Sequence, residues 1–382
     1  IRTMNSTKLI GITPFEIPDL ALLKALSKTK IFPVLHVGND SNEKENLFKE
    51  ISSYPPKSIG LCFGQTDIPE QARLPESVGL VIMPFENIVK LNSTITEIIY
   101  QVYTYDEAIG AKKLGAKTII IKGNEAGGKV GNDSTFILFQ RIIQDADLRE
   151  LDIWIQGGVG THSAAALIAL GAKGIVLDSQ LALFPECSAP HSLKNIIEKL
   201  NGNETKVIGG HRVLIRPNSP NLLGEPTYEN LRPYLIGTYN LENSYLSVGQ
   251  DITLSKDLVK RYKTLDRLSF GLSEAIAGHI KQAQYENVIR PENPLANELN
   301  IKFPIAQGPM TRVSDVPAFA KSVSDAGALP FIALSLMTGD KAKELVHTTH
   351  ELLEGKAWGA GILGFAPQEL REEQTQYIME VK

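Results

Sequence analysis

The fold of this chain is decided by the stretch Ile119-Ile120-Ile121-Lys122-Gly123-Asn124-Glu125-Ala126-Gly127-Gly128-Lys129, where an apolar run meets a glycine-rich loop. A short way along the chain the same junction returns as Ile153-Trp154-Ile155-Gln156-Gly157-Gly158-Val159-Gly160. Glycine lets backbone N–H groups approach phosphate oxygens because no Cβ intervenes, and a helix N-terminus that follows adds positive potential. The two junctions indicate either a phosphate-bearing cofactor across the top of a parallel sheet or two ordinary tight turns.

Outward from these junctions, apolar and β-branched runs alternate with amphipathic runs of helix length. The eight expected strands are residues 8–13, 31–37, 58–63, 78–83, 98–103, 118–121, 152–155 and 174–177. The expected helices are residues 18–28, 44–52, 106–114, 134–147 and 163–170. This order predicts an α/β fold, a (β/α)8 TIM barrel over residues 1–200, with a doubly wound open sheet as the competing architecture.

The rhythm of strands and helices changes after residue 200. Residues 201–295 carry loop signals and an amphipathic helical run, which predicts a small helical subdomain and a linker. From residue 296 to 382 the β-α-β-α-β order of residues 8–63 returns. A sheet of about three strands cannot close, so we expect the truncated start of a second β/α barrel. Both ends of the sequence look cut, which predicts a piece of a longer polypeptide.

Composition narrows the class of protein. The chain has 382 residues, of which 43% are hydrophobic, and its net charge is only −4. This balance argues against a partner such as nucleic acid or a membrane surface that is held by charge. Two cysteines, Cys62 and Cys187, offer neither a disulfide framework nor zinc spacing, so we expect a reduced, cytoplasmic protein without a metal. No apolar run is long enough to predict a membrane span.

Three motifs carry a family resemblance: Gly123-Asn124-Glu125-Ala126-Gly127-Gly128-Lys129, Gln156-Gly157-Gly158-Val159 and Ala306-Gln307-Gly308-Pro309-Met310. With them the chain resembles the nitronate monooxygenase (2-nitropropane dioxygenase) family. That family includes flavin-dependent enoyl-acyl-carrier-protein reductases and the enoyl reductases of polyunsaturated fatty-acid and polyketide synthases. The resemblance covers residues 8–190 as a whole barrel and 300–382 as a second start. Tandem copies of this kind resemble the N-terminal part of large type I polyketide synthases.

The resemblance implies a TIM barrel that binds FMN. The phosphate would lie between the Gly157-Gly158 loop and the turn Asp178-Ser179-Gln180, where this fold commonly binds phosphate. The residues implied as cofactor-binding are Gln101, Lys122, Gly123, Gly128, Gly157, Gly158 and Ser179. Gln101 and Lys122 would reach the flavin ring, and Gly123 and Gly128 would let the backbone pass beside it. Lys129 closes the glycine loop where the family usually has a histidine, and is the implied catalytic residue.

Departures from the family pattern affect the same site. An exposed lysine at position 129 is a poor base near neutral pH unless its pKa is lowered. At the turn after strand eight, Asp178-Ser179-Gln180 stands where the family usually has Gly-Thr, and Asp178 would repel a phosphate nearby. The family's Gln-Gly-Pro-Met sequence at the first strand is Ile12-Thr13-Pro14-Phe15 here, and is intact only at Gln307-Gly308-Pro309-Met310. His36, at the end of a strand, either faces the barrel mouth or, as is more common for such a histidine, is structural. Glu16 and Asp19 are expected to be solvated.

Two hypotheses follow. The first is an FMN-dependent oxidoreductase that works on a small molecule or an acyl thioester, with an acyl carrier protein and the other domains of a larger synthase as partners. Enoyl-thioester reduction and nitronate oxidation both fit it. The second, which the departures at Lys129 and Asp178 favour, is a catalytically degenerate barrel that serves as a structural or docking module for the second barrel.

Overall fold

The computed structural model describes residues 8–38, 44–64, 74–86, 97–222, 224–235 and 237–381. The chain divides into two compact units, Ile1–Ile280 and Lys281–Lys382. Residues 201–280, which the sequence sets apart from the barrel, therefore pack within the first unit.

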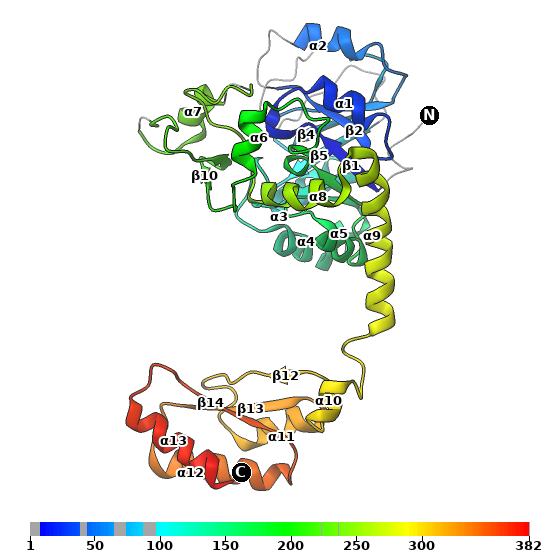
Figure 1. Ribbon diagram of the computed structural model, residues 1–382. Helices are drawn as coiled ribbons and strands as arrows, with labels where there is room; N and C mark the ends of the chain where they lie inside the picture. The colour runs from blue at the N-terminus through cyan, green and yellow to red at the C-terminus, as the bar shows by residue number, and fades with distance from the viewer. Residues whose placement is uncertain are drawn as a thin grey trace. The chain divides into compact units, whose positions relative to one another are not determined.

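Eight parallel strands close into a barrel in the first unit (Figure 1). They are β1 (Leu9–Ile12), β2 (Phe32–His36), β3 (Ile59–Cys62), β4 (Val78–Pro84), β5 (Glu97–Val102), β6 (Thr118–Lys122), β8 (Asp152–Gln156) and β9 (Gly174–Leu177). The ring closes where β1 pairs with β9, with Leu9 opposite Ile175. The predicted (β/α)8 fold is confirmed. The open-sheet alternative is wrong, because an open sheet would leave its first and last strands unpaired.

Side chains along each barrel strand alternate between two cores. Ile120 belongs to the core inside the barrel, whereas Ile119 and Ile121 pack in the outer core with helical residues such as Leu138. The inner core consists of Ile10, Ile12, Phe32, Val34, Cys62, Leu80, Ile82, Ile99, Ile120, Trp154 and Val176. Because the alternation has a period of two, the residue two positions after an inner-core residue also points along the barrel axis.

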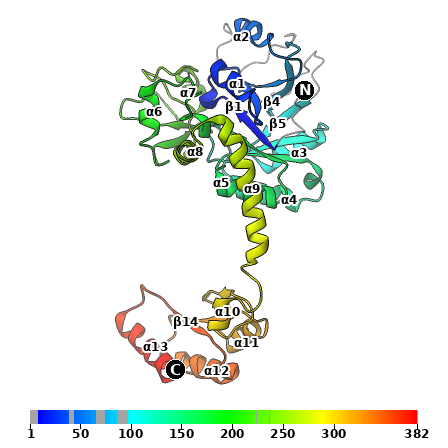
Figure 2. The same ribbon diagram turned by 45° about the vertical axis from the view of Figure 1, so that its right-hand side comes forward.

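Helices cover the outside of the barrel (Figure 2). They are α1 (Leu20–Leu26), α2 (Lys44–Ile51), α3 (Tyr105–Lys113), α4 (Thr135–Gln144), α5 (Thr161–Ala169) and α6 (His191–Ile197), with the 3-10 turn η3 (Leu148–Glu150). Two further 3-10 turns, η2 (Pro14–Glu16) and η4 (Ser179–Leu181), follow β1 and β9 at the carboxyl ends of the strands. Side-chain caps fix several of their starts: Thr104 accepts from the Glu107 N–H and Ser134 from the Ile137 N–H. Because all eight strands are parallel, their carboxyl ends lie at the same end of the barrel, which we call the mouth.

The segment after residue 200 lies on the barrel rather than apart from it. Its elements are β10 (Thr205–Ile208), β11 (His211–Leu214), α7 (Tyr228–Leu231), η5 (Arg232–Tyr234), η6 (Gln250–Thr253), α8 (Leu254–Tyr262) and α9 (Leu265–Glu286). β10 and β11 form an antiparallel sheet with the short strand β7 (Gly128–Lys129), which is the end of the first glycine loop. The first half of α9 joins the outer core of the barrel through Leu265, Leu268, Leu272 and Ile276. Among the described residues, no helix is both long enough and apolar enough to cross a membrane.

The second unit contains a three-stranded parallel sheet in the order β12-β13-β14. Its elements are α10 (Pro294–Glu298), β12 (Ala306–Gln307), α11 (Pro317–Asp325), β13 (Leu329–Ser335), α12 (Gly339–Leu353), β14 (Gly359–Ile362) and α13 (Gln368–Glu380). Its own apolar core includes Ala320, Ile332, Leu334 and Val346. The sheet is open in the described residues, and its identity as the start of a second barrel stays a prediction.

Candidate active site

A layer of polar side chains sits on top of the apolar barrel interior at the carboxyl ends of the strands. Gln101, Lys122, Gln156 and Asp178 each follow an inner-core residue by two positions, so the strand period turns all four toward the mouth. They are between 2% and 8% exposed. Gln101 and Lys122 were expected to end neighbouring strands, and they lie close together here because β5 pairs with β6.

Hydrogen bonds join most of this layer into a chain. The Tyr103 hydroxyl donates to Gln101 Oε1 at 3.3 Å, and Gln101 Nε2 donates to Gln156 Oε1 at 2.8 Å. Gln156 Nε2 then donates to Asp178 Oδ2 at 2.6 Å. The amide orientations are therefore fixed across the mouth, which gives the site a rigid polar floor.

Lys122 stands apart from that chain of hydrogen bonds. Its side chain is buried, yet no carboxylate in the described part of the protein lies within 4 Å of its ammonium group. Its charge acts at longer range on Glu16. Burial alone raises the pKa of Glu16, but His36, His211 and Lys122, with a hydrogen bond from Ser247, outweigh burial and lower it. The mouth thus holds a buried positive charge without a direct counter-ion.

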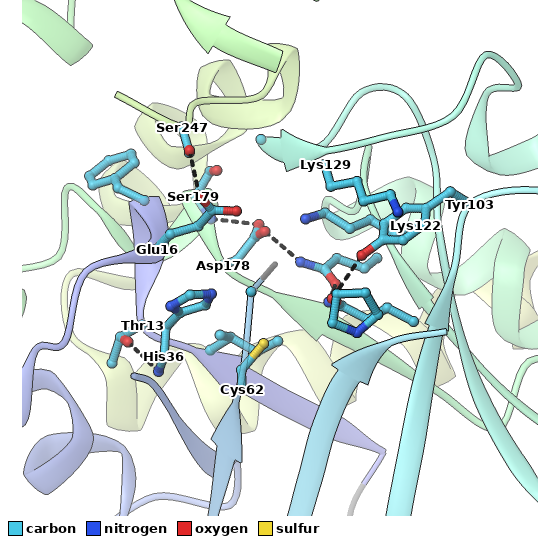
Figure 3. A pocket seen from close by; sticks show the side chains of 17 residues that line it. Thr13, Glu16, His36, Cys62, Tyr103, Lys122, Lys129, Asp178, Ser179 and Ser247 are labelled. Atoms are coloured by element: carbon cyan, nitrogen blue, oxygen red, sulfur yellow. Dashed lines mark hydrogen bonds between the residues drawn. The ribbon is translucent and has the colours of Figure 1, made fainter. Parts of the chain in front are cut away.

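Lys129, the predicted catalytic residue, also lines the mouth, on the same side as Lys122 and Tyr103 (Figure 3). Its ammonium group lies 2.5 Å from a carboxylate oxygen of Glu86 and 4.9 Å from the ring centre of Tyr103. Its backbone belongs to β7, opposite His211 of β11. The lysine is therefore held by a carboxylate at the rim of the mouth and not solvated in a loop.

The glycines of the first loop approach the chain's own groups closely. A Cβ atom on Gly123 would lie 2.0 Å from Thr135 Oγ1, and one on Gly128 would lie 2.2 Å from Glu16 Oε1. Gly128 also has φ +76, in the left-handed region that favours glycine. Both positions require glycine whether or not a cofactor binds, so a bulky residue there would not report on flavin alone.

The acid of the first loop caps a helix. The Glu125 carboxylate accepts from the Thr135 N–H, at 3.0 Å to one oxygen, and from the Thr135 hydroxyl at 3.0 Å. This places a negative charge at the N-terminus of α4, where it interacts favourably with the helix dipole. The Glu-Ala-Gly-Gly sequence thus has a structural reason in this chain.

Residues 244–252, which we name the mouth strap, cross the barrel between the two glycine loops. Ser247 donates to Glu16 Oε2 at 2.8 Å, and the Leu246 carbonyl accepts from the Leu214 N–H at 2.9 Å. A Cβ atom on Gly249 would lie 2.3 Å from the carbonyl oxygen of Glu125, so strap and loop touch along their backbones. The strap therefore contacts both the Glu16 side of the mouth and the first glycine loop.

The strap ends in a buried acid at the second glycine loop. Asp251 is 3% exposed, and its Oδ2 accepts from the Gly158 N–H at 3.3 Å and from Gln180 Nε2 at 3.1 Å. The Ser179 N–H of the neighbouring turn is taken by Asp178 Oδ1 at 2.5 Å. Two of the backbone donors expected near a phosphate, the Gly158 and Ser179 N–H groups, are thus bonded to carboxyl groups of the chain.

The mouth as it is closed here does not fit FMN. The cavity that Lys122, Gln101, His36 and the neighbouring side chains enclose has a volume of about 30 Å³, whereas pockets for ligands of drug size measure about 300–1,000 Å³. Two donors at the phosphate end are occupied by Asp251 and Asp178. The polar floor under the strap has the character expected at a flavin ring, so the misfit comes from the strap and the acids at the phosphate end.

Two expectations about acids near the first strand are wrong. Asp19 is 2% exposed and accepts from the Leu22 N–H and the Ser188 N–H, so it caps α1 inside the protein. Glu16 lines the mouth instead of facing solvent, and both Phe15 and Glu16 have positive φ, 66° and 60°. His36, for which a place at the mouth and a structural place were both open, lines the mouth as well. Spacing could have found His36, which follows the inner-core residue Val34 by two positions.

Sequence reasoning missed the groups that come from the strap and from β11. Ser247 and Asp251 lie far along the chain from the barrel motifs, in a stretch without regular periodicity. His211 is buried beside Lys129 and stacks on Tyr228 with ring centres 4.4 Å apart. In the described part of the chain, no cluster of three or more His, Cys, Asp or Glu side chains could hold a metal ion.

A family model matches part of the first unit. Residues 75–217 match the family model described as nitronate monooxygenase. This range runs from just before β4 past the end of β11 and includes both glycine loops. No curated protein matches the chain.

Solved structures share the fold. FabK from Thermotoga maritima superposes with a TM-score of 0.55 at 19% identity, covering 75% of this chain and 98% of that one. The enoyl reductase domain of MlnA, from the macrolactin biosynthesis cluster of Bacillus amyloliquefaciens, gives 0.51 at 11% identity, covering 72% of this chain and 95% of that one. At such low identity the likeness establishes the fold and leaves the reaction open.

Proposed function

We propose that this barrel, which belongs to the nitronate monooxygenase-like family, is an FMN-dependent oxidoreductase that requires the mouth strap to withdraw before cofactor and substrate enter. The family description and the enoyl reductase domain of similar fold both denote oxidoreductases, which supports an enzyme of the flavin type at that coarse level. FMN itself and the reaction of this chain are our proposal.

The observation that carries the proposal is the buried ammonium group of Lys122. A buried charge without a direct partner is costly, and such groups occur preferentially at functional sites. Lys122 lies on the barrel axis next to the amides of Gln101 and Gln156, which the hydrogen-bonded chain holds in place. A flavin would supply electron or hydride transfer, and Lys122 would supply fixed positive charge where negative charge develops.

The substrate class follows from the family resemblance. Enoyl-thioester reduction within a polyketide or fatty-acid synthase is the activity we favour, with an acyl carrier protein as the partner that delivers the thioester. The tandem arrangement supports this, because a second sheet of the same strand order follows in the chain. Nitronate oxidation remains the competing reaction on the same barrel.

A second candidate function is a catalytically degenerate barrel that serves as a structural or docking module. The specific observation in its favour is the filled mouth, with a cavity of about 30 Å³. A barrel whose loop donors are satisfied internally gains stability and loses the ability to bind a cofactor.

The test is the flavin content of the purified chain. We expect the wild-type protein, reconstituted with excess FMN, to show flavin absorbance that denaturation releases, and Lys122→Met to retain less than a tenth of it. Lys113→Met, at the end of α3 outside the barrel, is the matched control. Absence of flavin after reconstitution, both from wild type and from a variant whose strap no longer reaches the second glycine loop, would exclude the enzyme proposal for this barrel and favour the docking module.

A further inference from the structure

The mouth strap brings a carboxyl group to the place where the barrel motifs predict a phosphate. Asp251 Oδ2 receives the Gly158 N–H, and the carboxyl lies by the loop that leads into α5. Glycine loops that open onto a helix N-terminus bind anions because their N–H groups and the helix dipole point the same way. In this structure that position holds a carboxyl group of the chain itself.

The contacts of Asp251 resemble those of a ligand more than those of a core residue. Besides the Gly158 N–H, Oδ2 receives Gln180 Nε2, which also donates to the Val159 carbonyl at 3.2 Å. Oδ1 is buried and has no hydrogen-bond partner among the described residues. A buried oxygen without a donor is costly, so the position binds a carboxyl group imperfectly.

Burial and the charges around Asp251 disfavour the ionised form of its carboxyl group. Burial, followed by the nearby charges of Asp178 and Glu125, raises its pKa well above the ordinary value, and the Gly158 N–H and Lys122 only partly oppose this. Arg212 of β11 is a further cation close enough to interact with it. The strap is therefore held by its backbone and apolar contacts against an unfavourable electrostatic environment at its end.

We propose that Asp251 is an intramolecular competitor of the cofactor phosphate, which occupies the anion position of the second glycine loop and keeps this barrel from taking up FMN while the strap is closed. The inference rests on the proposed function for the identity of the cofactor, but the anion position rests on geometry alone. A tethered group competes at a high effective concentration. A free phosphate group must also enter beside Asp178 and Glu125, which repel it.

The experiment compares the intact chain with Asp251→Gly, which removes the carboxyl and opens room, and Asp251→Asn, which keeps the shape without the charge. Gln250→Gly, at the exposed neighbouring position of the strap, is the matched control for added backbone freedom. FMN and riboflavin binding are measured by flavin fluorescence, and the effect of inorganic phosphate by the thermal midpoint. Riboflavin has the ring without the phosphate, so it separates the two ends of the site.

We expect Asp251→Gly to bind FMN at least about tenfold more tightly than wild type or Gln250→Gly, with Asp251→Asn in between. Riboflavin binding should change little. Inorganic phosphate should raise the thermal midpoint of Asp251→Gly and leave that of wild type unchanged.

Three outcomes separate this inference from the proposed function. If wild type and Asp251→Gly bind FMN equally, Asp251 does not compete and the inference is overturned, while the oxidoreductase proposal stands. If no form binds FMN but phosphate stabilises Asp251→Gly alone, the anion position is supported and the flavin proposal fails. If neither FMN nor inorganic phosphate distinguishes Asp251→Gly from Gln250→Gly, the inference is wrong. Should Asp251→Gly not fold, the same holds if neither ligand distinguishes Asp251→Asn from wild type.

Discussion

At the scale of single residues, Lys122 and Glu16 are coupled through the buried mouth. Because the pKa of Glu16 lies below its ordinary value of 4.5, Glu16 stabilises the fold above that pH, and this contribution is lost as pH falls through the lowered pKa. Lys122→Met removes this support for the Glu16 carboxylate but also relieves the cost of burying an unpaired charge, so we expect the change in the free energy of unfolding to be less favourable at pH 7 than at pH 4, by about 1 kcal/mol. Urea unfolding at both pH values measures the difference.

The neighbouring lysine provides the control. Lys129 pairs with Glu86, whose side chain is 57% exposed, so Lys129→Met should cost no more than about 1 kcal/mol. An equal change in the free energy of unfolding for Lys122→Met at pH 7 and pH 4 would mean that packing, and not charge, explains the effect.

Asp251 predicts the opposite dependence on pH. Its pKa is raised above the ordinary value of 3.8, so its contribution to stability is fully present below about that pH and is lost as pH rises through the raised pKa. The groups that face it are Asp178, Glu125, Lys122 and Arg212. We expect Asp251→Asn to exceed wild type in thermal midpoint at pH 8, with the gap closing toward pH 4, as followed by circular dichroism.

An acid on the outside of the same region supplies the comparison. Asp257 of α8 is exposed, so Asp257→Asn should give a curve parallel to that of wild type. Parallel curves for Asp251→Asn as well would show that Asp251 is not buried in its charged environment in solution.

At the scale of elements, the mouth depends on the contact between the strap and the first glycine loop. Gly249 has φ −84, a value that any residue can adopt, so a methyl group there tests the contact itself. Because the new Cβ would lie 2.3 Å from the Glu125 carbonyl oxygen, we expect Gly249→Ala to lower the free energy of unfolding by about 1–3 kcal/mol. Hydrogen exchange of the strap amides should accelerate, which mass spectrometry detects.

An alanine substitution at a glycine with free space around it should raise the free energy of unfolding instead of lowering it. Gly278 of α9 has no atom within 4 Å of its Cβ position, so Gly278→Ala should stabilise the chain by about 0.5–1 kcal/mol through helix propensity. If Gly249→Ala leaves both stability and exchange unchanged, the strap does not close on the loop in solution.

At the scale of the whole molecule, the two units meet in sequence within α9 and the turn after it. The first half of α9 supplies buried side chains to the barrel, whereas Tyr285, Val288 and Ile289 are 83%, 69% and 64% exposed. Segments with few buried contacts open most easily to proteases. We expect limited proteolysis to cut first between residues 284 and 293 and to leave a barrel fragment whose thermal midpoint matches that of the intact chain.

Mass spectrometry of the first fragments checks this expectation. Initial cleavage within residues 205–262 instead would mean that the sheet and helices over the mouth are less firmly held than their burial indicates. It would also favour a strap that opens readily.

The order of the barrel strands and the direction of their side chains can be predicted from the sequence. A strand with a period of two fixes which side chains enter the interior, so Ile120 and Lys122 on β6 share a direction before any tertiary contact is known. The order of strands and helices then allows a closed parallel ring, and the polar residues that end neighbouring strands must meet at its mouth. Gln101 and Lys122 were named from the family resemblance, and the period of their strands is the local signal that agrees with it.

What covers the mouth was decided only by the tertiary structure. Asp251 and Ser247 carry no local signal, and their positions depend on how residues 201–280 fold back over the barrel. The turn that buries Glu16 likewise depends on two residues with positive φ and on the charges of Lys122 and His211, which come from distant elements. A periodic pattern determines where a strand points its side chains, whereas the contacts of an irregular segment depend on the surface that it covers.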